Sequence, residues 1–154
     1  LIIGVDFGYE SEMEELIQSK GLENKILVIK KPPRDHVLAA YNESNFLVLP
    51  SRWELSPLTP LEGFLFKKAV ISTDSHGIPH TLQNNVNSIL VKNENIVELS
   101  DAILELLHNP EKCREFGNMG YEFIKKYANL KKKKKNILEV YKESIHVKNE
   151  SHEK

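Results

Sequence analysis

Short apolar runs recur along the chain, and none of them alternates cleanly with polar residues. The runs are residues 1–5, 26–29, 46–49, 69–72 and 88–91. A strand with one solvated face alternates apolar and polar residues, whereas a continuous apolar strand is typical of a sheet that is buried on both faces. The pattern therefore predicts a parallel sheet with helices packed on each side.

Segments with helical periodicity separate these runs. They cover residues 10–20, 35–43 and 58–66. After the last strand, three apolar stripes with helical spacing follow one another, over residues 96–107, 113–127 and 137–145. Alternating strands and helices that end in a helical tail predict an α/β fold with a Rossmann-like open parallel sheet. We expect one domain over residues 1–146 and a polar, disordered tail over residues 147–154.

Composition narrows the class of protein further. Of the 154 residues, 40% are hydrophobic and 28% are charged, which is typical of a globular domain. The formal net charge of -1 gives no basis for a nucleic-acid partner. Cys113 is the single cysteine, which excludes an internal disulfide and is compatible with a cytoplasmic protein. No apolar run reaches the roughly 18 residues that span a bilayer.

A lysine run stands out near the C-terminus. Residues 131–135 are all lysines, and Lys125 and Lys126 lie close by in the sequence. A basic segment of this kind can contact an anionic membrane surface, which predicts a peripheral membrane contact of the parent protein. The alternative, which we favour, is a solvated helix face.

The loop after residues 46–49 has the most unusual composition in the chain. It reads PSRWELSPLTPLEGF over residues 50–64. Ligands of open parallel sheets bind outside the carboxyl ends of the strands. A helix that begins near Leu58 directs free N–H groups toward this loop, which suits a phosphate or another anion. Glu54 in the loop and Glu62 about one turn inside the helix then suit the hydroxyls of a sugar and a ribose.

Arg52, Trp53 and Gly77 each have two interpretations. Arg52 either contacts a phosphate or pairs with Glu54. Trp53 is favoured as a packing residue over a stacking platform, because aromatic side chains are usually buried. Gly77 either supplies a backbone φ that other residues avoid, close to the sugar, or forms a plain turn.

A wider motif surrounds the two glutamates. Its parts are the strand end Pro50-Ser51, the pair Glu54 and Glu62 as E-x7-E, the strand end Thr73-Asp74 and the turn Gly77-Ile78-Pro79. This combination closely resembles the GT-B glycosyltransferases of family 4 (glycosyltransferase group 1), and the resemblance extends from about residue 1 to residue 145. It implies the C-terminal, donor-binding half of a GT-B fold, with its first strand–helix unit missing.

The resemblance implies an enzyme that transfers a sugar, of the hexosyl type, from a nucleotide-diphosphate sugar with retention at the anomeric carbon. No metal or other cofactor is expected. In this family the residue that corresponds to Glu62 binds the ribose of the nucleotide. The residue that corresponds to Glu54 lies beside the donor sugar and is the expected catalytic residue.

Backbone groups complete the site that the resemblance implies. The amides around Ser56 and Leu58 approach the sugar and the diphosphate, and Thr59 adds a hydroxyl to a phosphate. Lys31 lies in the loop that corresponds to the place where the family holds the base.

The chain departs from the family in two respects. The usual Gly-Phe-Gly after the first glutamate is Leu55-Ser56-Pro57 here, and Pro57 has no N–H to donate.

The second departure is that the family's Arg/Lys pair and its acceptor-binding domain lie upstream of residue 1. Fixed cations at the leaving group are a major part of such catalysis. We therefore expect the N-terminal acceptor-binding domain of the parent chain as a partner, and no turnover from this fragment alone.

Two other functions stay open. The first is a sugar-nucleotide epimerase or a phosphorylase on the same scaffold, which would turn over a sugar nucleotide without an acceptor. The second is a catalytically silent α/β binding module, for which the replaced Gly-Phe-Gly segment and the absent cations are the arguments.

Overall fold

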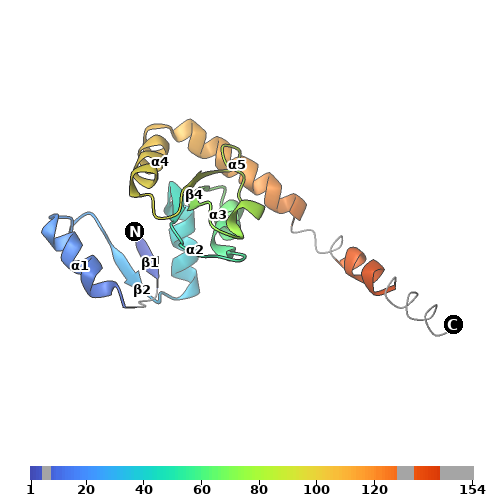
Figure 1. Ribbon diagram of the computed structural model, residues 1–154, viewed down its shortest axis with the longest axis horizontal. Helices are drawn as coiled ribbons and strands as arrows, with labels where there is room; N and C mark the ends of the chain where they lie inside the picture. Colours follow the sequence, from blue (N-terminus) through green and yellow to red (C-terminus); the bar gives the residue numbers. More distant parts are fainter. Residues whose placement is uncertain (5–7, 128–133, 143–154) are drawn as a thin grey trace. The chain divides into compact units, whose positions relative to one another are not determined.

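The computed structural model describes residues 1–4, 8–127 and 134–142, which fall into two units, Leu1–Ser44 and Asn45–Lys154. Parallel strands alternate with helices in both units (Figure 1), as the apolar pattern predicts. The strands form two parallel sheets, one in each unit, where a single sheet was expected. The strands of the first sheet have three residues each, so they offer few backbone hydrogen bonds for pairing.

The first unit is a strand–helix–strand segment with a helix after it. Strand β1 (Ile2–Gly4) pairs in parallel with β2 (Val28–Lys30). Helix α1 (Glu10–Ser19) connects these strands, and α2 (Arg34–Glu43) follows them. Acidic residues occupy the first turn of α1, where the helix dipole favours negative charge. The chain leaves this helix through Gly21 at a φ of 62°, the left-handed conformation that is common just after a helix end.

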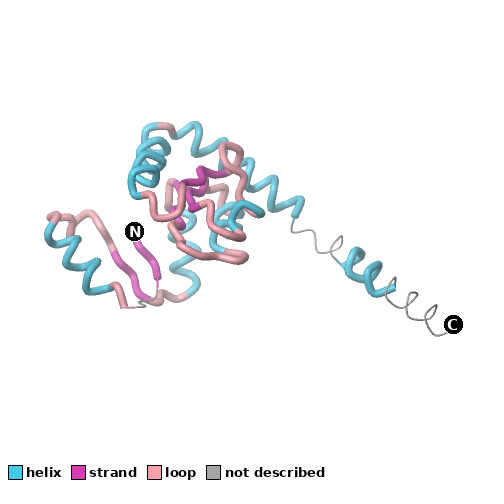
Figure 2. The backbone as a smooth tube through the Cα atoms, viewed as in Figure 1, coloured by secondary structure: helices cyan, strands magenta, loops and turns pink. Residues whose placement is uncertain are grey.

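The second unit contains a three-stranded parallel sheet with the order β3-β4-β5. Figure 2 shows strands in magenta and helices in cyan. Its elements are, in chain order, β3 (Phe46–Leu49), α3 (Leu58–Leu65), β4 (Ala69–Thr73), the 3-10 helix η1 (Ile78–His80), β5 (Ser88–Val91), α4 (Ile96–His108) and α5 (Pro110–Tyr127). The strands at residues 46–49 and 88–91 have the predicted bounds, and β4 is one residue longer than predicted. Sequence patterning therefore located the strands of this unit almost to the residue, whereas η1 was not predicted and α5 begins three residues earlier than predicted.

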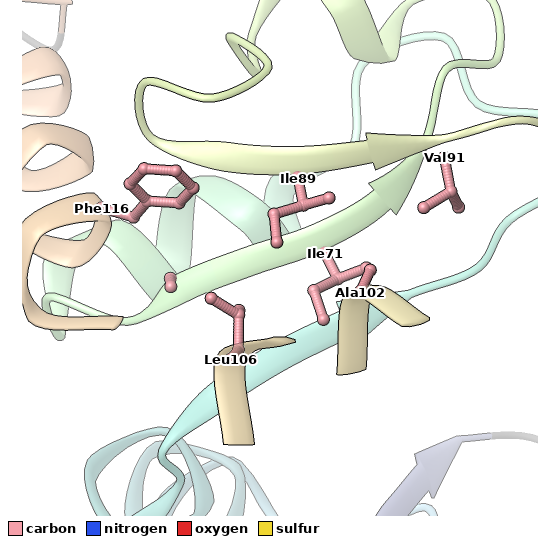
Figure 3. Packing of buried hydrophobic residues seen from close by; sticks show 7 residues of the cluster. Ile71, Ile89, Val91, Ala102, Leu106 and Phe116 are labelled. Carbon is pink, nitrogen blue, oxygen red and sulfur yellow. The ribbon is translucent and has the colours of Figure 1, made fainter. Parts of the chain in front are cut away.

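Both faces of the second sheet are covered, which explains why every residue of β4 is buried. On one face, strand side chains pack against α4 and Phe116 of α5 (Figure 3); this cluster contains Ala69, Ile71, Ile89, Val91, Ala102, Leu106 and Phe116. On the other face, Val70 packs with residues of α3, η1 and α5; this cluster contains Phe64, Val70, Ile78, Leu82 and Ile124. The prediction of helices on both faces is confirmed for this sheet.

Helix α5 contributes to both clusters, through Phe116 and Ile124. Two glycines allow its close approach to the rest of the unit. A Cβ atom on Gly117 would lie 1.9 Å from the backbone oxygen of Lys67, and one on Gly120 would lie 2.1 Å from a ring carbon of Phe64. Side chains at these two positions would therefore push α5 away from the sheet.

Cys113 packs against the cluster on the α4 face, as the apolar helix pattern predicts. Its thiol donates a hydrogen bond to the carbonyl oxygen of Leu106, at 3.2 Å. Burial raises the pKa of the Cys113 thiol, because the thiolate would lose hydration. The residue therefore behaves as a small core side chain.

The described part of the C-terminal segment is helical over residues 134–142. Lys134 and Lys135 are exposed there, in agreement with a solvated helix face. The rest of the lysine run and the predicted polar tail at residues 147–154 lie outside the described residues. No helix within the described residues is long and apolar enough to cross a membrane.

Candidate functional site

Three loops come together at one edge of the β3-β4-β5 sheet. They are residues 50–57 after β3, residues 74–77 after β4 and residues 92–95 after β5. Because the strands are parallel, their carboxyl ends lie at the same edge, which is where ligands bind in folds of this class. Hydrogen bonds join the first of these loops to the other two.

Hydroxyl groups of β4 hold the start of the 50–57 loop. The Ser72 hydroxyl donates to the carbonyl oxygen of Leu49 at 2.8 Å, and the Thr73 hydroxyl donates to the carbonyl oxygen of Ser51 at 2.6 Å. The Ser51 hydroxyl in turn donates to the carboxylate of Glu54 at 3.1 Å. Ser72 and Thr73 are buried, so this chain of bonds connects the half-buried Glu54 to the rigid central strand.

The structure gives Arg52 a partner that the sequence did not predict. Its guanidinium Nε lies 3.0 Å from a carboxylate oxygen of Glu94, and its backbone oxygen accepts a hydrogen bond from the Asn93 side chain at 3.0 Å. Of the two interpretations of Arg52, the pairing with Glu54 is therefore wrong. The physical reason is that Asn93 draws this part of the loop toward residues 92–95. Both charged side chains are mostly exposed, so the ion pair adds little stability.

Gly77 fixes the far side of the same loop. Its N–H donates to the carbonyl oxygen of Glu54 at 2.9 Å. Of the two interpretations of Gly77, the unusual φ is wrong, because Gly77 has an ordinary φ of -79°. Glycine is required for another reason: a Cβ atom here would lie 1.7 Å from the backbone oxygen of Leu55. The left-handed backbone belongs to its neighbour His76, with a φ of 47°.

Trp53 points outward from the middle of the loop. Its side chain is 60% exposed, so the favoured packing role is wrong. The indole meets the His76 ring edge-on, with ring centroids 6.0 Å apart and an angle of 63° between the planes. The backbone on either side is held by the bonds to Arg52 and Glu54, and this arrangement leaves the Trp53 side chain at the surface.

Helix α3 begins directly after the loop, with its N-terminus at the same edge. Pro57 is buried at the N-cap. Helix α3 has no side-chain hydrogen bond at its N-cap and no acidic residue in its first turn. The first N–H groups of a helix have no intrahelical partner, so Leu58 and Thr59, both exposed, supply donors for an anion. Pro57 and Pro60 have no N–H. Glu62 lies half-buried in the next turn.

The structure thus groups most of the predicted site residues at one edge of the second unit. They are Arg52, Glu54, Ser56, Pro57, Leu58, Thr59, Glu62 and Gly77. Lys31 belongs to the first unit, where it is exposed and its N–H donates to the Gly4 carbonyl oxygen at 3.2 Å. In the part of the chain that the structure describes, no three His, Cys, Asp or Glu residues are grouped to hold a metal ion.

Sequence reasoning did not assign roles to Asn93, Glu94 or Ser72. Each lies at or just after the carboxyl end of a parallel strand, and this position is the signal that would have identified them. Their partners are far away in the sequence, so a linear pattern gives no indication of the contacts.

Comparisons with known proteins place the chain in a family. The family model for glycosyl transferases group 1 matches residues 1–123. The uncharacterized glycosyltransferase MJ1178 of Methanocaldococcus jannaschii is 34% identical over 94 residues, which cover 61% of this chain and 27% of that protein. The chain thus spans about a quarter of the length of this relative.

Two solved structures show the same fold. The sucrose-phosphate synthase of Thermosynechococcus elongatus is 20% identical, with a TM-score of 0.80 over 94% of this chain and 38% of that one. Alr3699/HepE of Anabaena, solved in complex with UDP, is 19% identical, with a TM-score of 0.77 over 93% of this chain and 40% of that one.

Proposed function

This chain belongs to the glycosyl transferases group 1 family, and from that premise we propose that its carboxyl-edge loops bind a nucleotide-diphosphate sugar as the donor of a retaining glycosyltransferase. The acceptor would be bound by another domain of the parent protein. The chain on its own would bind the donor without transferring the sugar. In the parent enzyme, the sugar would be a hexose and would pass to the acceptor with its anomeric configuration retained.

One observation carries the proposal: an uncapped helix N-terminus lies between two glutamates at the ligand-binding edge of the sheet. The dipole of α3 and the N–H groups of Leu58 and Thr59 favour a diphosphate. Glu62, one turn further on, would accept hydrogen bonds from the ribose diol. Glu54, on the loop side, would face the hydroxyls of the sugar. The order of these groups in the sequence matches the order of sugar, diphosphate and ribose in the donor.

The same groups suggest how the bond to the leaving group is weakened. Negative charge develops on the diphosphate as its bond to the anomeric carbon breaks, and preorganised donors at α3 stabilise that charge. The hydroxyl of Thr59 would add a further donor. In this proposal no metal ion is needed at the diphosphate, and Lys31 would lie beside the base. Cytoplasmic location and a peripheral membrane contact of the parent protein remain part of the same proposal.

The proline at position 57 favours a second candidate function, a binding module without catalytic activity. At this N-cap the family's glycine would offer an N–H, and proline offers none. Proline at this position removes one hydrogen-bond donor next to the sugar, while the N–H groups of Leu58 and Thr59 remain. The two candidates differ in whether a nucleotide diphosphate binds at all.

A calorimetric panel of UDP, GDP and ADP with their sugars tests the proposal. We expect one base to bind, with UDP as the first choice because a structural neighbour was solved with UDP. Glu62→Ala should weaken that binding by about 10-fold or more, since hydrogen bonds to a charged group contribute about 1.5–3 kcal/mol. Glu115→Ala, which removes an exposed acid of α5, is the matched control and should bind as the unmodified chain does.

Binding of no nucleotide would overturn the donor site and leave the silent module. Binding that Glu62→Ala and Glu115→Ala weaken equally would place the nucleotide elsewhere. Turnover of the sugar nucleotide without any acceptor would instead favour an epimerase or a phosphorylase.

A further inference from the structure

We propose that Trp53, with His76 against it, forms a platform on which a pyranose ring stacks, and that this platform helps to select the sugar. The inference rests on the proposed function, because it adds a sugar-selecting side chain to the same site. It concerns a sugar ring as such, whether it belongs to the donor or to the acceptor.

The exposure of Trp53 is the first observation. Aromatic side chains usually bury most of their surface, and this indole is 60% exposed beside a half-buried glutamate. Its ring contact with His76 is edge-on, at 6.0 Å between centroids. The two rings are inclined rather than stacked, and the 60% exposure of Trp53 leaves indole surface available to a ligand.

The rigidity of the loop is the second observation. The carbonyl oxygen of Arg52 is held by Asn93, and that of Glu54 is held by Gly77, so both backbone neighbours of Trp53 are tied to other loops. The close approach of Leu55 to Gly77 leaves no room for movement in that direction. The backbone that carries the indole is therefore restrained before a ligand arrives, which lowers the entropy cost of stacking.

The chemistry of the position points to a sugar. Trp53 directly precedes Glu54, which the proposed function assigns to the sugar hydroxyls, whereas the ribose is assigned to Glu62, beyond the diphosphate site. A pyranose ring has a face of C–H groups that packs on an aromatic face, and its hydroxyls can accept from the indole N–H. A base would have to lie on the far side of the diphosphate.

The chain carries its own probe for this contact, because Trp53 is the single tryptophan in the sequence. Its fluorescence therefore reports on this loop alone. We expect a nucleotide-diphosphate sugar to shift the emission of Trp53 to shorter wavelength, since stacking removes water from the indole. The matching nucleotide diphosphate without a sugar should leave the emission unchanged. A methyl glycoside, added after the diphosphate, tests for an acceptor sugar.

Variants of Trp53 provide an independent measurement by calorimetry. Trp53→Ala should weaken binding of the sugar nucleotide by about 10-fold and change binding of the diphosphate by less than about twofold. Trp53→Phe should keep most of the affinity, because it keeps an aromatic face. Leu107→Ala, which truncates an exposed apolar residue near the end of α4, is the control and should change neither.

The outcomes separate the two proposals. If no nucleotide binds, the donor site itself is wrong and the platform falls with it. If the sugar nucleotide binds in a Glu62-dependent manner, Trp53→Ala binds it as well as the unmodified chain, and the glycoside causes no emission shift, the platform alone is overturned. An emission shift with the diphosphate alone would mean that Trp53 stacks on the base, which also overturns it. A shift with the sugar nucleotide assigns the platform to the donor, and a shift with the glycoside assigns it to the acceptor.

Discussion

At Gly77, the missing Cβ atom lets two loops touch. The Leu55 carbonyl oxygen occupies the space where that atom would be, and the Gly77 N–H holds the carbonyl oxygen of Glu54. The position of the Glu54 backbone therefore depends on a residue that is 23 positions away in the sequence. The shape of this loop is therefore set by backbone contacts as well as by side chains.

Gly77→Ala should damage the site more than the fold. The added Cβ atom would push the 54–56 segment aside, which we expect to cost about 1–3 kcal/mol of unfolding free energy and to weaken donor binding by about 10-fold. Urea denaturation and calorimetry measure the two effects. Gly4→Ala is the control, because a Cβ atom there meets nothing within 4 Å. Unchanged donor binding in Gly77→Ala would show that the contact with Leu55 does not position the loop.

Among the elements, α5 ties the second unit together. It supplies Phe116 to the cluster on one face of the sheet and Ile124 to the cluster on the other. Gly117 lies against the backbone that leads into β4, and Gly120 lies against Phe64 of α3. Two small residues at i and i+3 thus let one helix pack closely against the rest of the unit.

Gly117→Ala should destabilise the second unit by about 1–3 kcal/mol, because the backbone of Lys67 cannot move as a flexible side chain would. The free energy of unfolding in urea measures this. Asn118→Ala, at the exposed neighbouring position of α5, is the control and should change stability by less than about 0.5 kcal/mol. Equal effects of the two substitutions would contradict close packing at Gly117.

At the scale of the whole molecule, the two units differ in how much they bury. In residues 1–4 and 8–44, Tyr41 is the one buried side chain, whereas the second unit contains two apolar clusters. Local stability follows the burial of apolar groups and backbone hydrogen bonds. The two units should therefore open with different free energies.

Hydrogen exchange followed by mass spectrometry tests this difference. Peptides from β1 and β2 should exchange faster than peptides from β4, by about 10-fold or more in protection factor. Addition of the nucleotide that binds in the calorimetric panel should slow hydrogen exchange in residues 50–65 more than in residues 110–127. Equal protection of β1 and β4 would show that the two units open together.

Much of the fold follows from local patterns. Continuous apolar runs located the strands, helical periodicity located the helices, and both faces of the second sheet are covered as predicted. The strand–loop–helix pattern placed Glu54 in a loop and Glu62 in the helix after it, and the structure agrees. These features involve residues that are close in the sequence, so a linear pattern can specify them.

By itself, the sequence determined the order of the elements, the family and the segment that carries the candidate site. Only the tertiary structure decided the roles of the residues around that site. Arg52 pairs with Glu94, Gly77 accommodates Leu55, and Trp53 stays exposed. Each of these outcomes depends on contacts between loops that follow different strands. The sheet brings the loops together in space, and a pattern along the chain does not specify which of their atoms meet.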